Sequence, residues 1–426
     1  MQNDIVFKTF KTFSNLYVYD RHTNAIYKIS DEEYQELYSV ELGMIPPSES
    51  SVIKDFQDTG ILLPNVVKKI EHNSSIIVEQ YIDTRCQQLT LQVTQQCNLR
   101  CNYCAYSGSY KHNRTHSSKR MSLITAKQAI DFFLEHNSEL PEVVIGFYGG
   151  EPLLEFNLIK ECVKYAISKT EGKTVRFNMT TNGTLITDEV ADFLVHNNVM
   201  LSISLDGAKK EHDYNRKFIN GEGTFDVIIE NINKMRNRYP EYDKSITIST
   251  TVNPHTDLRC VLEYFSTDEV FNDRSIIFNT MSEIGYSSDI PFIQQYYIAR
   301  NYEYMKMLFS LVGKLDSKYV SPLFNKTKDE LKRKLASINN RELMRTIAHY
   351  GGPCLPGVMR LYVRTDGVLF PCERINEMIN YYSIGTLENG FDIEKIRNLL
   401  NIGQHVSIPC HSEPPVRDLR ATIPAK

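Results

Sequence analysis

Runs of apolar residues alternate with amphipathic stretches through the middle of this chain. Six short, largely apolar runs predict β-strands at 89–93, 143–148, 174–180, 199–205, 246–252 and 276–280. Between these runs, apolar residues recur at helical spacing at 122–136, 157–168, 187–197 and 224–239. Strands that alternate with helices build a parallel sheet covered by helices. We therefore expect an α/β fold in which residues 86–345 form a partial (β/α)6 barrel.

The first 85 residues follow a different pattern. Two alternating, aromatic-rich runs at 15–20 and 24–29 predict a β-hairpin. Ser30, followed by three acidic residues, predicts the start of a helix, and a second short helix is expected at 48–58. A hairpin with short helices is typical of a winged-helix-like unit, and a simple cap on the larger domain is the alternative.

The carboxy-terminal part divides into a helical section and a short β-section. Helices are expected at 292–315 and 326–337, where aromatic residues at helical spacing indicate packing. Further on, Gly367 ends a turn signal between two apolar runs, which predicts a hairpin. We expect three domains, with bounds at 1–85, 86–345 and 346–426.

The composition is that of an ordinary globular protein. The 426 residues are 42% hydrophobic and 23% charged, and the net charge of −4 gives no support for a nucleic-acid or anionic-membrane surface. No run approaches the ~18 apolar residues that cross a bilayer, and the first residues contain no cleavable apolar signal with small residues behind it. Nine cysteines without such a signal favour the reducing cytoplasm, where thiols bind metals or react.

Three of these cysteines stand together directly after the first predicted strand. Cys97, Cys101 and Cys104 are spaced four and three residues apart, which suits a soft metal or an iron–sulfur cluster. A [4Fe–4S] cluster held by three thiolates keeps one iron without a protein ligand, and an open metal position is where chemistry occurs. A zinc knuckle that lacks its fourth ligand, or three unrelated thiols, are the alternatives.

Other motifs follow the next three predicted strands. Gly149-Gly-Glu-Pro152 follows the second strand, Thr181-Asn-Gly183 the third and Asp206-Gly207 the fourth. The carboxyl ends of parallel strands meet at one rim of a barrel, where active sites lie. The four segments are therefore expected to converge, and this places the cysteines in an active site.

A second group of cysteines flanks the predicted carboxy-terminal hairpin. Cys354 and Cys372 lie at its ends, each preceded by proline, and Cys410 follows later. We interpret Cys354, Cys372 and Cys410 as ligands of an auxiliary metal cluster, with reduced core cysteines as the alternative.

These motifs resemble those of a known superfamily. The cysteine triplet with Tyr103, together with the Gly-Gly-Glu-Pro tetrad, is similar to the radical SAM superfamily. The spacing from Cys354 through Gly367 to Cys372 resembles the start of the SPASM extension, found in peptide maturases and anaerobic sulfatase-maturating enzymes. The resemblance covers roughly residues 85 to 390.

The resemblance implies a cofactor set and its ligands. The cysteine triplet would hold a [4Fe–4S] cluster, S-adenosylmethionine would bind the free iron, and an external one-electron donor of the flavodoxin or ferredoxin type would reduce the cluster. The resulting 5′-deoxyadenosyl radical would abstract a substrate hydrogen. Residues implied in S-adenosylmethionine binding are Tyr103, Gly149, Gly150, Glu151, Ser204 and Arg216.

The resemblance implies a role for each of these residues, and two of the residues have a simpler alternative. Backbone carbonyls at the two glycines would approach the amino group, and Glu151 would add charge or fix the turn. Tyr103 would contact the adenosyl moiety. Ser204 would hydrogen-bond the ribose or be a plain sheet residue, and Arg216 would contact the methionine carboxylate or form a surface ion pair.

The resemblance also implies a class of substrate. Residues 1–85 look like the leader-binding element of ribosomal peptide maturases, which would capture a precursor peptide as an added strand. DNA binding is disfavoured because this unit has no basic helix. We expect a peptide maturase that forms a cross-link such as a thioether. The alternatives are formylglycine formation, with Glu373 as the base, and an inert leader-binding scaffold.

Two segments depart from the expected pattern. A SPASM extension carries further closely spaced cysteines, but only Cys410 follows Cys372, and residues 412–426 are expected to be unstructured. We expect an incomplete extension, from a truncated or frame-shifted copy rather than a naturally reduced one. The basic stretch 111–120 is expected to be a solvated loop, with closure over the substrate as the alternative.

Overall fold

The computed structural model describes residues 5–170, 172–271, 274–281, 286–287, 293–339, 343–349 and 354–401. The described chain divides into two compact units. The first takes in the chain up to Asn73 and a segment that starts at Asn325, and the second takes in Ser74–Phe324 and the segment after Cys354. The three-domain division at residues 85 and 345 stays a prediction.

A parallel sheet forms the centre of the second unit. Its six parallel strands are β5 (Gln88–Thr94), β6 (Glu142–Gly149), β7 (Thr174–Thr181), β8 (Met200–Ser204), β9 (Thr247–Val252) and β10 (Ile276–Thr280). They lie side by side in the order in which they occur in the chain. The predicted strands and the α/β fold with a mostly parallel sheet are confirmed.

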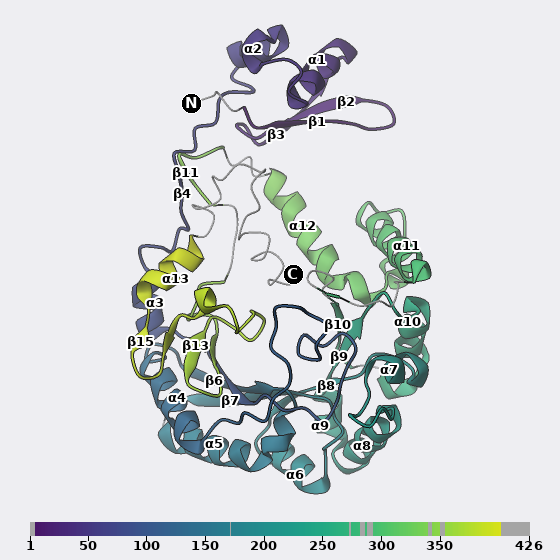
Figure 1. Cartoon of the computed structure of the whole chain (residues 1–426). Helices are drawn as coiled ribbons and strands as arrows, with labels where there is room; N and C mark the ends of the chain where they lie inside the picture. The colour runs from purple at the N-terminus through teal and green to yellow at the C-terminus, as the bar shows by residue number, and fades with distance from the viewer. Residues whose placement is uncertain are drawn as a thin grey trace. The chain divides into compact units, whose positions relative to one another are not determined.

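Helices cover the outer side of this sheet (Figure 1). The predicted helices are confirmed as α4 (Leu123–Glu135), α5 (Phe156–Lys169), α6 (Asp188–His196) and α8 (Phe225–Arg238). The other helices of this unit are α3 (Val78–Thr84), α7 (Lys209–Asn215), α9 (Pro240–Ser245), α10 (Leu258–Thr267), α11 (Gln294–Leu311) and α13 (Ile393–Leu400). Their starts follow local capping rules, since Ser122 and Thr187 each accept a backbone N–H of the first turn. No helix in the described ranges is long and apolar enough to cross a bilayer.

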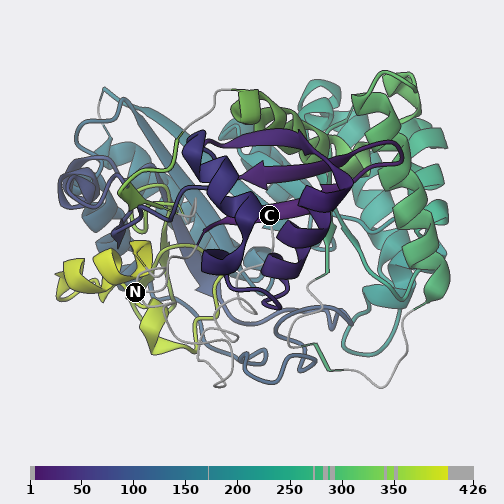
Figure 2. The same ribbon diagram turned by 90° about the horizontal axis from the view of Figure 1, so that it is seen from above.

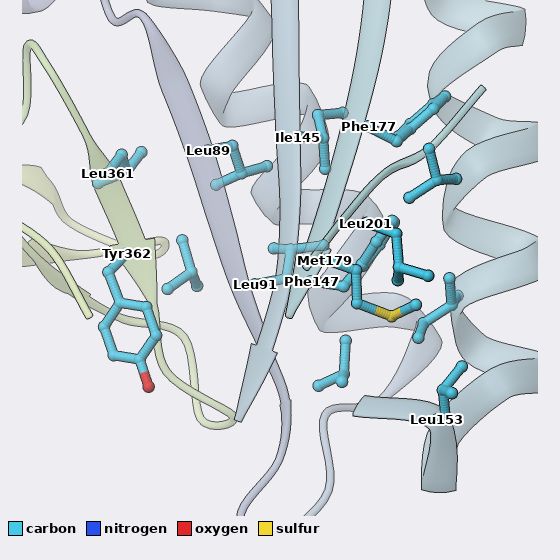
Figure 3. Close-up of a cluster of buried hydrophobic side chains, with 14 of the residues drawn as sticks. Leu89, Leu91, Ile145, Phe147, Leu153, Phe177, Met179, Leu201, Leu361 and Tyr362 are labelled. Atoms are coloured by element: carbon cyan, nitrogen blue, oxygen red, sulfur yellow. The ribbon is translucent and has the colours of Figure 1, made fainter. Parts of the chain in front are cut away.

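The core lies between the sheet and these helices. Figure 3 shows side chains from neighbouring strands meeting there, among them Leu91, Phe147, Phe177 and Met179, all buried. Each such side chain contributes about 1.5–3 kcal/mol by leaving water. Buried and partly exposed residues alternate along β9, because successive side chains of a strand point to opposite faces of the sheet.

The carboxy-terminal segment extends the same sheet. The predicted hairpin is confirmed as β12 (Leu361–Val363) and β13 (Val368–Phe370), which are antiparallel, with Gly367 in the turn at φ 83°. Strand β12 pairs in parallel with β5, and β14 (Gly385–Thr386) and β15 (Gly390–Phe391) follow at the edge. The sequence did not indicate this docking, because it contains no signal for which strand a short hairpin joins.

The first unit carries a small antiparallel sheet with two helices, drawn in purple in Figure 2. The predicted hairpin is confirmed as β2 (Leu16–Asp20) and β3 (Ala25–Ile29), and Ser30 caps α1 (Asp31–Glu41) with a capping box. A third strand, β1 (Phe7–Lys11), pairs with β2 and was not predicted. The further elements are α2 (Ser51–Asp58), α12 (Asn325–Asn339), β4 (Lys69–Ile70) and β11 (Ile347–Ala348).

Candidate active site

The three cysteines lie in the loop that follows β5. Cys97 and Cys101 are buried and pack with Leu99, while Cys104 is partly buried beside them. Burial raises the pKa of the Cys97 thiol to about 12 and also raises that of Cys101. Both are therefore neutral thiols unless a positive metal centre displaces the protons, and metal binding would be coupled to proton release.

Two of the three sulfurs in this loop accept backbone hydrogen bonds. In the described part of the chain, no three His, Cys, Asp or Glu side chains are placed to hold one metal ion. The backbone N–H of Leu99 donates to Cys97 Sγ and that of Tyr106 to Cys104 Sγ, both at 3.4 Å. Hydrogen bonds to the sulfurs are what iron–sulfur ligation uses to stabilise thiolates. The three thiols with their N–H donors thus fit an iron–sulfur cluster.

Backbone pairing holds the cysteine loop against the segment that follows α7. Arg100 N donates to Lys217 O at 2.8 Å, and Asn102 N donates to Asn215 O at 3.0 Å. The side chain of Arg100 also donates to Cys97 O at 2.8 Å. The loop that follows β5 is therefore fixed by residues that follow β8.

Gly149, the last residue of β6, and Gly150 let that strand end pack directly on the start of the cysteine loop. Gly150 N donates to Thr94 O at 3.0 Å. A Cβ on Gly149 would lie 2.1 Å from Thr94 O, and one on Gly150 would lie 2.0 Å from Gln96 O. Because backbone packs directly on backbone here, there is no room for a side chain. Glycine is therefore required at both positions whether or not a ligand binds. Contact of the two glycines with S-adenosylmethionine stays a prediction.

Glu151 is a structural carboxylate at the rim of the sheet. It is buried and accepts hydrogen bonds from Thr181 Oγ1 and Asn182 N, both at 2.7 Å, and from Leu153 N at 3.1 Å. Burial raises its pKa above the usual value, although these bonds oppose the shift. Of its two expected roles, the geometry favours fixing the turn. Glu151 does so by joining the ends of β6 and β7.

Asp206 joins two of the expected ligand-binding residues. Its Oδ2 accepts from the Tyr103 hydroxyl and, at 2.9 Å, from Arg216 Nε, while its Oδ1 accepts from Thr251 N at 2.9 Å. Burial opposes the charge of Arg216, but the Asp206 carboxylate holds its pKa well above the usual value. The Arg216 ion pair is thus buried, and the surface ion pair considered from the sequence is wrong.

The sequence placed Asp206 in the motif that follows the fourth strand but gave its side chain no role. Its position after β8, level with the motifs that follow β5, β6 and β7, is the signal that could have identified it as a site residue. Ser204 is buried as the last residue of β8 and lies opposite Ser249 of β9. Its contact with a ribose stays a prediction. The expected convergence of the first four strand ends is confirmed by the contacts among their loops.

Of the three cysteines expected to bind an auxiliary cluster, two lie within the described residues. Cys354 is exposed and Cys372 is partly buried, with burial raising the Cys372 pKa. Cys410 and the segment 412–426 lie outside the described residues. Glu373 receives a hydrogen bond from Arg360 Nη1 at 2.5 Å, and its Oε2 is buried with no hydrogen-bond partner among the described residues. The auxiliary cluster and the base role of Glu373 stay predictions.

Known proteins are similar to parts of this sequence. Residues 91–264 match the model of the radical SAM superfamily. The chain is 30% identical over 157 residues to the serine-type anaerobic sulfatase-maturating enzyme of Bacteroides thetaiotaomicron, which covers 36% of this chain and 37% of that protein. It is 32% identical over 167 residues to the cysteine-type enzyme of Clostridium novyi (38% and 44%). It is 24% identical over 289 residues to the radical SAM cyclopropyl synthase TigE of Paramaledivibacter caminithermalis (63% and 57%).

The fold is also similar to that of a solved structure, native anSMEcpe with bound AdoMet. The TM-score is 0.53 at 19% identity, over 75% of this chain and 82% of that chain. At this identity the likeness concerns the fold alone. The chain spans 37% and 44% of the length of the two sulfatase-maturating enzymes it matches. The match to the model of the radical SAM superfamily is to residues 91–264, which is less than half of the chain.

Proposed function

Because residues 91–264 form a radical SAM domain, we propose that this chain is a radical SAM enzyme that modifies a peptide. The observation that carries the proposal is the buried contact between the cysteine loop and the end of β8, in which Asp206 accepts hydrogen bonds from Tyr103 and Arg216. It places three thiols, an aromatic ring and a guanidinium at one rim of the sheet. Thiolates bind iron–sulfur clusters, and an aromatic ring beside a guanidinium suits a charged, adenosyl-containing ligand.

Each residue of the rim has a proposed task. Cys97, Cys101 and Cys104 would hold a [4Fe–4S] cluster, with the amides of Leu99 and Tyr106 stabilising two of the thiolates. When bound, the cluster and S-adenosylmethionine supply a 5′-deoxyadenosyl radical that removes a hydrogen atom from the substrate. An external flavodoxin or ferredoxin would deliver the electron.

Binding of S-adenosylmethionine is assigned to residues of the same rim. Gly149 and Gly150 would present backbone carbonyls to its amino group, Tyr103 would contact the adenosyl moiety, and Ser204 would bind the ribose. The Nε atom of Arg216 is committed to Asp206, so its contact with the methionine carboxylate would use the Nη atoms. Glu151 would act only through the turn it fixes.

A peptide substrate is supported by the relatives and by the first unit. The relatives named above include sulfatase-maturating enzymes, and anSMEcpe has a solved structure with AdoMet and the Cp18Cys peptide. In the first unit, β1 and β3 are the two edge strands of the small sheet. An extended leader peptide could pair with such an edge, with main-chain hydrogen bonds giving affinity. We propose that this winged-helix-like unit captures the leader of a precursor peptide, which is then cross-linked, for example through a thioether.

The experiment that tests this function uses the full chain, reconstituted with iron and sulfide under anaerobic conditions. With S-adenosylmethionine and dithionite it should form 5′-deoxyadenosine, and the short peptide encoded beside its gene should lose mass by whole hydrogen atoms. The Cys97→Ala, Cys101→Ala, Cys104→Ala triple variant is the control and should form none. An inert wild type would leave a leader-binding scaffold as the function.

Formylglycine formation is the second candidate, favoured by Glu373 directly after Cys372. One of its carboxylate oxygens pairs with Arg360 and the other has no partner among the described residues, which leaves an acceptor for a substrate proton. Incubation with the Cp18Cys peptide separates the candidates. Conversion of its cysteine to an aldehyde, detected by a carbonyl-specific reagent and lost in Glu373→Gln, supports this second function.

A further inference from the structure

The basic segment after the cysteine loop is not wholly solvated, contrary to the prediction. Lys111 and Lys119 are exposed, but the side chain of Arg114 is only 8% exposed. Its Nε donates to Glu377, whose side chain is 2% exposed and which belongs to the carboxy-terminal segment. A buried arginine needs such a counter-charge, so this contact holds the middle of the segment in place.

Glu377 is itself held by residues of the central sheet. Its Oε2 accepts from Gln92 Nε2 of β5 at 2.7 Å and from the Tyr362 hydroxyl of β12 at 3.2 Å. Figure 3 shows Tyr362 on β12 beside the core. Both oxygens of the Glu377 carboxylate are therefore occupied, one by the sheet and one by Arg114.

A chain of direct contacts leads from Arg114 to the cysteines. Its guanidinium carbon lies 3.7 Å from the centre of the Tyr106 ring, at cation–π distance. Tyr106 N in turn donates to Cys104 Sγ at 3.4 Å. Arg114 is therefore separated from the third cysteine by a single aromatic residue.

One end of the guanidinium has no acceptor. Nη1 donates to Thr115 O at 3.3 Å, but Nη2 is buried without a hydrogen-bond partner among the described residues. A buried, charged N–H group without an acceptor is costly, and native structures provide a partner for it. Nη2 thus carries two N–H bonds without an acceptor, close to the cysteine site.

We propose that Arg114 is a binding residue for a main-chain carbonyl oxygen of the substrate peptide, and that Glu377 is the residue that positions it. The inference rests on the proposed function and deepens it. A neutral carbonyl fits because Glu377 already balances the charge of Arg114, so that a carboxylate would leave an uncompensated negative charge in a buried place. The carboxylate of S-adenosylmethionine is the other source of an acceptor oxygen.

The test compares four variants of the reconstituted full chain. Arg114→Gln and Arg114→Lys change the donor, Glu377→Gln changes its anchor, and Lys111→Gln removes an exposed charge from the same segment as the control. The KM is measured for S-adenosylmethionine and for the short peptide encoded beside the gene, by 5′-deoxyadenosine formation. Arg114→Gln should raise the peptide KM about tenfold or more, as expected for a lost hydrogen bond to a charged group. Arg114→Lys should be intermediate, and Lys111→Gln should match the wild type.

A second readout does not depend on activity. Trypsin cleaves after an arginine whose side chain can leave its contacts, so the bond after residue 114 should be cut several-fold faster in Glu377→Gln than in the wild type. Cleavage after the exposed Lys111 gives the internal reference. Added peptide should slow the cut after residue 114 in the wild type.

The outcomes are distinct. A wild type that forms no 5′-deoxyadenosine overturns the proposed function, and this inference with it. An active wild type whose peptide KM stays within roughly twofold in Arg114→Gln overturns the inference alone. A rise in the KM for S-adenosylmethionine instead assigns Nη2 to that ligand and also overturns it. If Arg114→Gln does not fold, Arg114→Lys and Glu377→Gln decide by the same measures.

Discussion

At the scale of single residues, the rim of the sheet contains positions whose close neighbours leave no room for another side chain or no substitute for a hydrogen bond. Gly149 and Gly150 face backbone atoms, Glu151 faces three donors, and Asp206 faces three more. Such positions are sensitive because a buried polar atom that loses its partner costs about 1–3 kcal/mol. Two predictions follow from individual residues.

Gly150→Ala should be strongly destabilising. Its Cβ would meet Gln96 O at 2.0 Å, and only a shift of the backbone beside Cys97 could relieve the clash. We expect a loss of about 3 kcal/mol or more in the free energy of unfolding in urea, and less iron bound after reconstitution. Gly108→Ala is the matched control, because its Cβ meets nothing within 4 Å and only the positive φ of 96° is strained. It should cost about 1 kcal/mol. Equal losses in the two variants would contradict the steric explanation.

His212 should make stability depend on pH. Its Nδ1 accepts from Asp206 N and its Nε2 lies 2.9 Å from Thr224 Oγ1, and burial lowers its pKa from 6.5 to about 4. Between these two pH values, His212 is therefore protonated in the unfolded chain and neutral in the folded chain. The contribution of His212 to the free energy of unfolding should be fully present above pH 6.5. The free energy of unfolding should then fall by roughly 3 kcal/mol as the pH drops to 4. Urea unfolding across this range checks the slope, which His212→Gln should reduce.

At the scale of elements, two contacts join parts of the fold that lie far apart in the chain. One links the cysteine loop to the end of β8, and the other adds β12 to the edge of the parallel sheet at β5. Each contact fixes a short segment on the central sheet, because the loop and the hairpin have too few residues to form a core of their own. Both contacts can be tested by single substitutions.

Asp206→Asn should destabilise the cysteine loop far more than Tyr103→Phe. The first change leaves buried Arg216 without its counter-charge, at a cost of about 3–5 kcal/mol. The second removes one hydrogen bond, at about 1 kcal/mol. Denaturation and iron content measured together check the order. The Asp206→Asn, Arg216→Gln double variant should recover part of the loss, and no recovery would argue against the ion pair as the cause.

Leu361→Ala should show whether the carboxy-terminal hairpin is an integral part of the sheet. Leu361 is fully buried in β12 and lies opposite Leu89 of β5. We expect a loss of about 2–5 kcal/mol for the whole second unit in one unfolding transition. The exposed Met359→Ala is the control. A separate early transition for the hairpin would mean that β12 is only loosely attached.

At the scale of the whole molecule, the iron content separates a radical SAM enzyme from an inert leader-binding scaffold. The reconstituted chain should lose about four iron atoms when Cys97, Cys101 and Cys104 are all replaced by alanine. Iron and sulfide analysis of both proteins measures this. Any iron that the triple variant retains is held elsewhere, and its loss on further replacement of Cys372 would identify the auxiliary cluster. If the triple variant kept the iron content of the wild type, Cys97, Cys101 and Cys104 would not be ligands of a cluster.

The sequence by itself determined the elements and the chemistry of the first motif. The six parallel strands, the helices between them and the Ser30 cap follow from spacing within a few residues, which is local information. The cysteine triplet and the paired glycines were visible for the same reason. The edge strand β1 was missed because its two phenylalanines are three positions apart, which does not fit the period of two that indicates a strand.

Only the tertiary structure decided which polar groups are paired and which strand the last hairpin joins. Tyr103 and Asp206 are 103 positions apart, and Arg114 and Glu377 are 263 apart. Arg114 and Glu377 look like surface residues in the sequence, because whether a charge can be buried depends on a distant counter-charge. A single sequence contains no record of such pairings, so the residues that shape the site around the cysteines emerge only when the chain is folded.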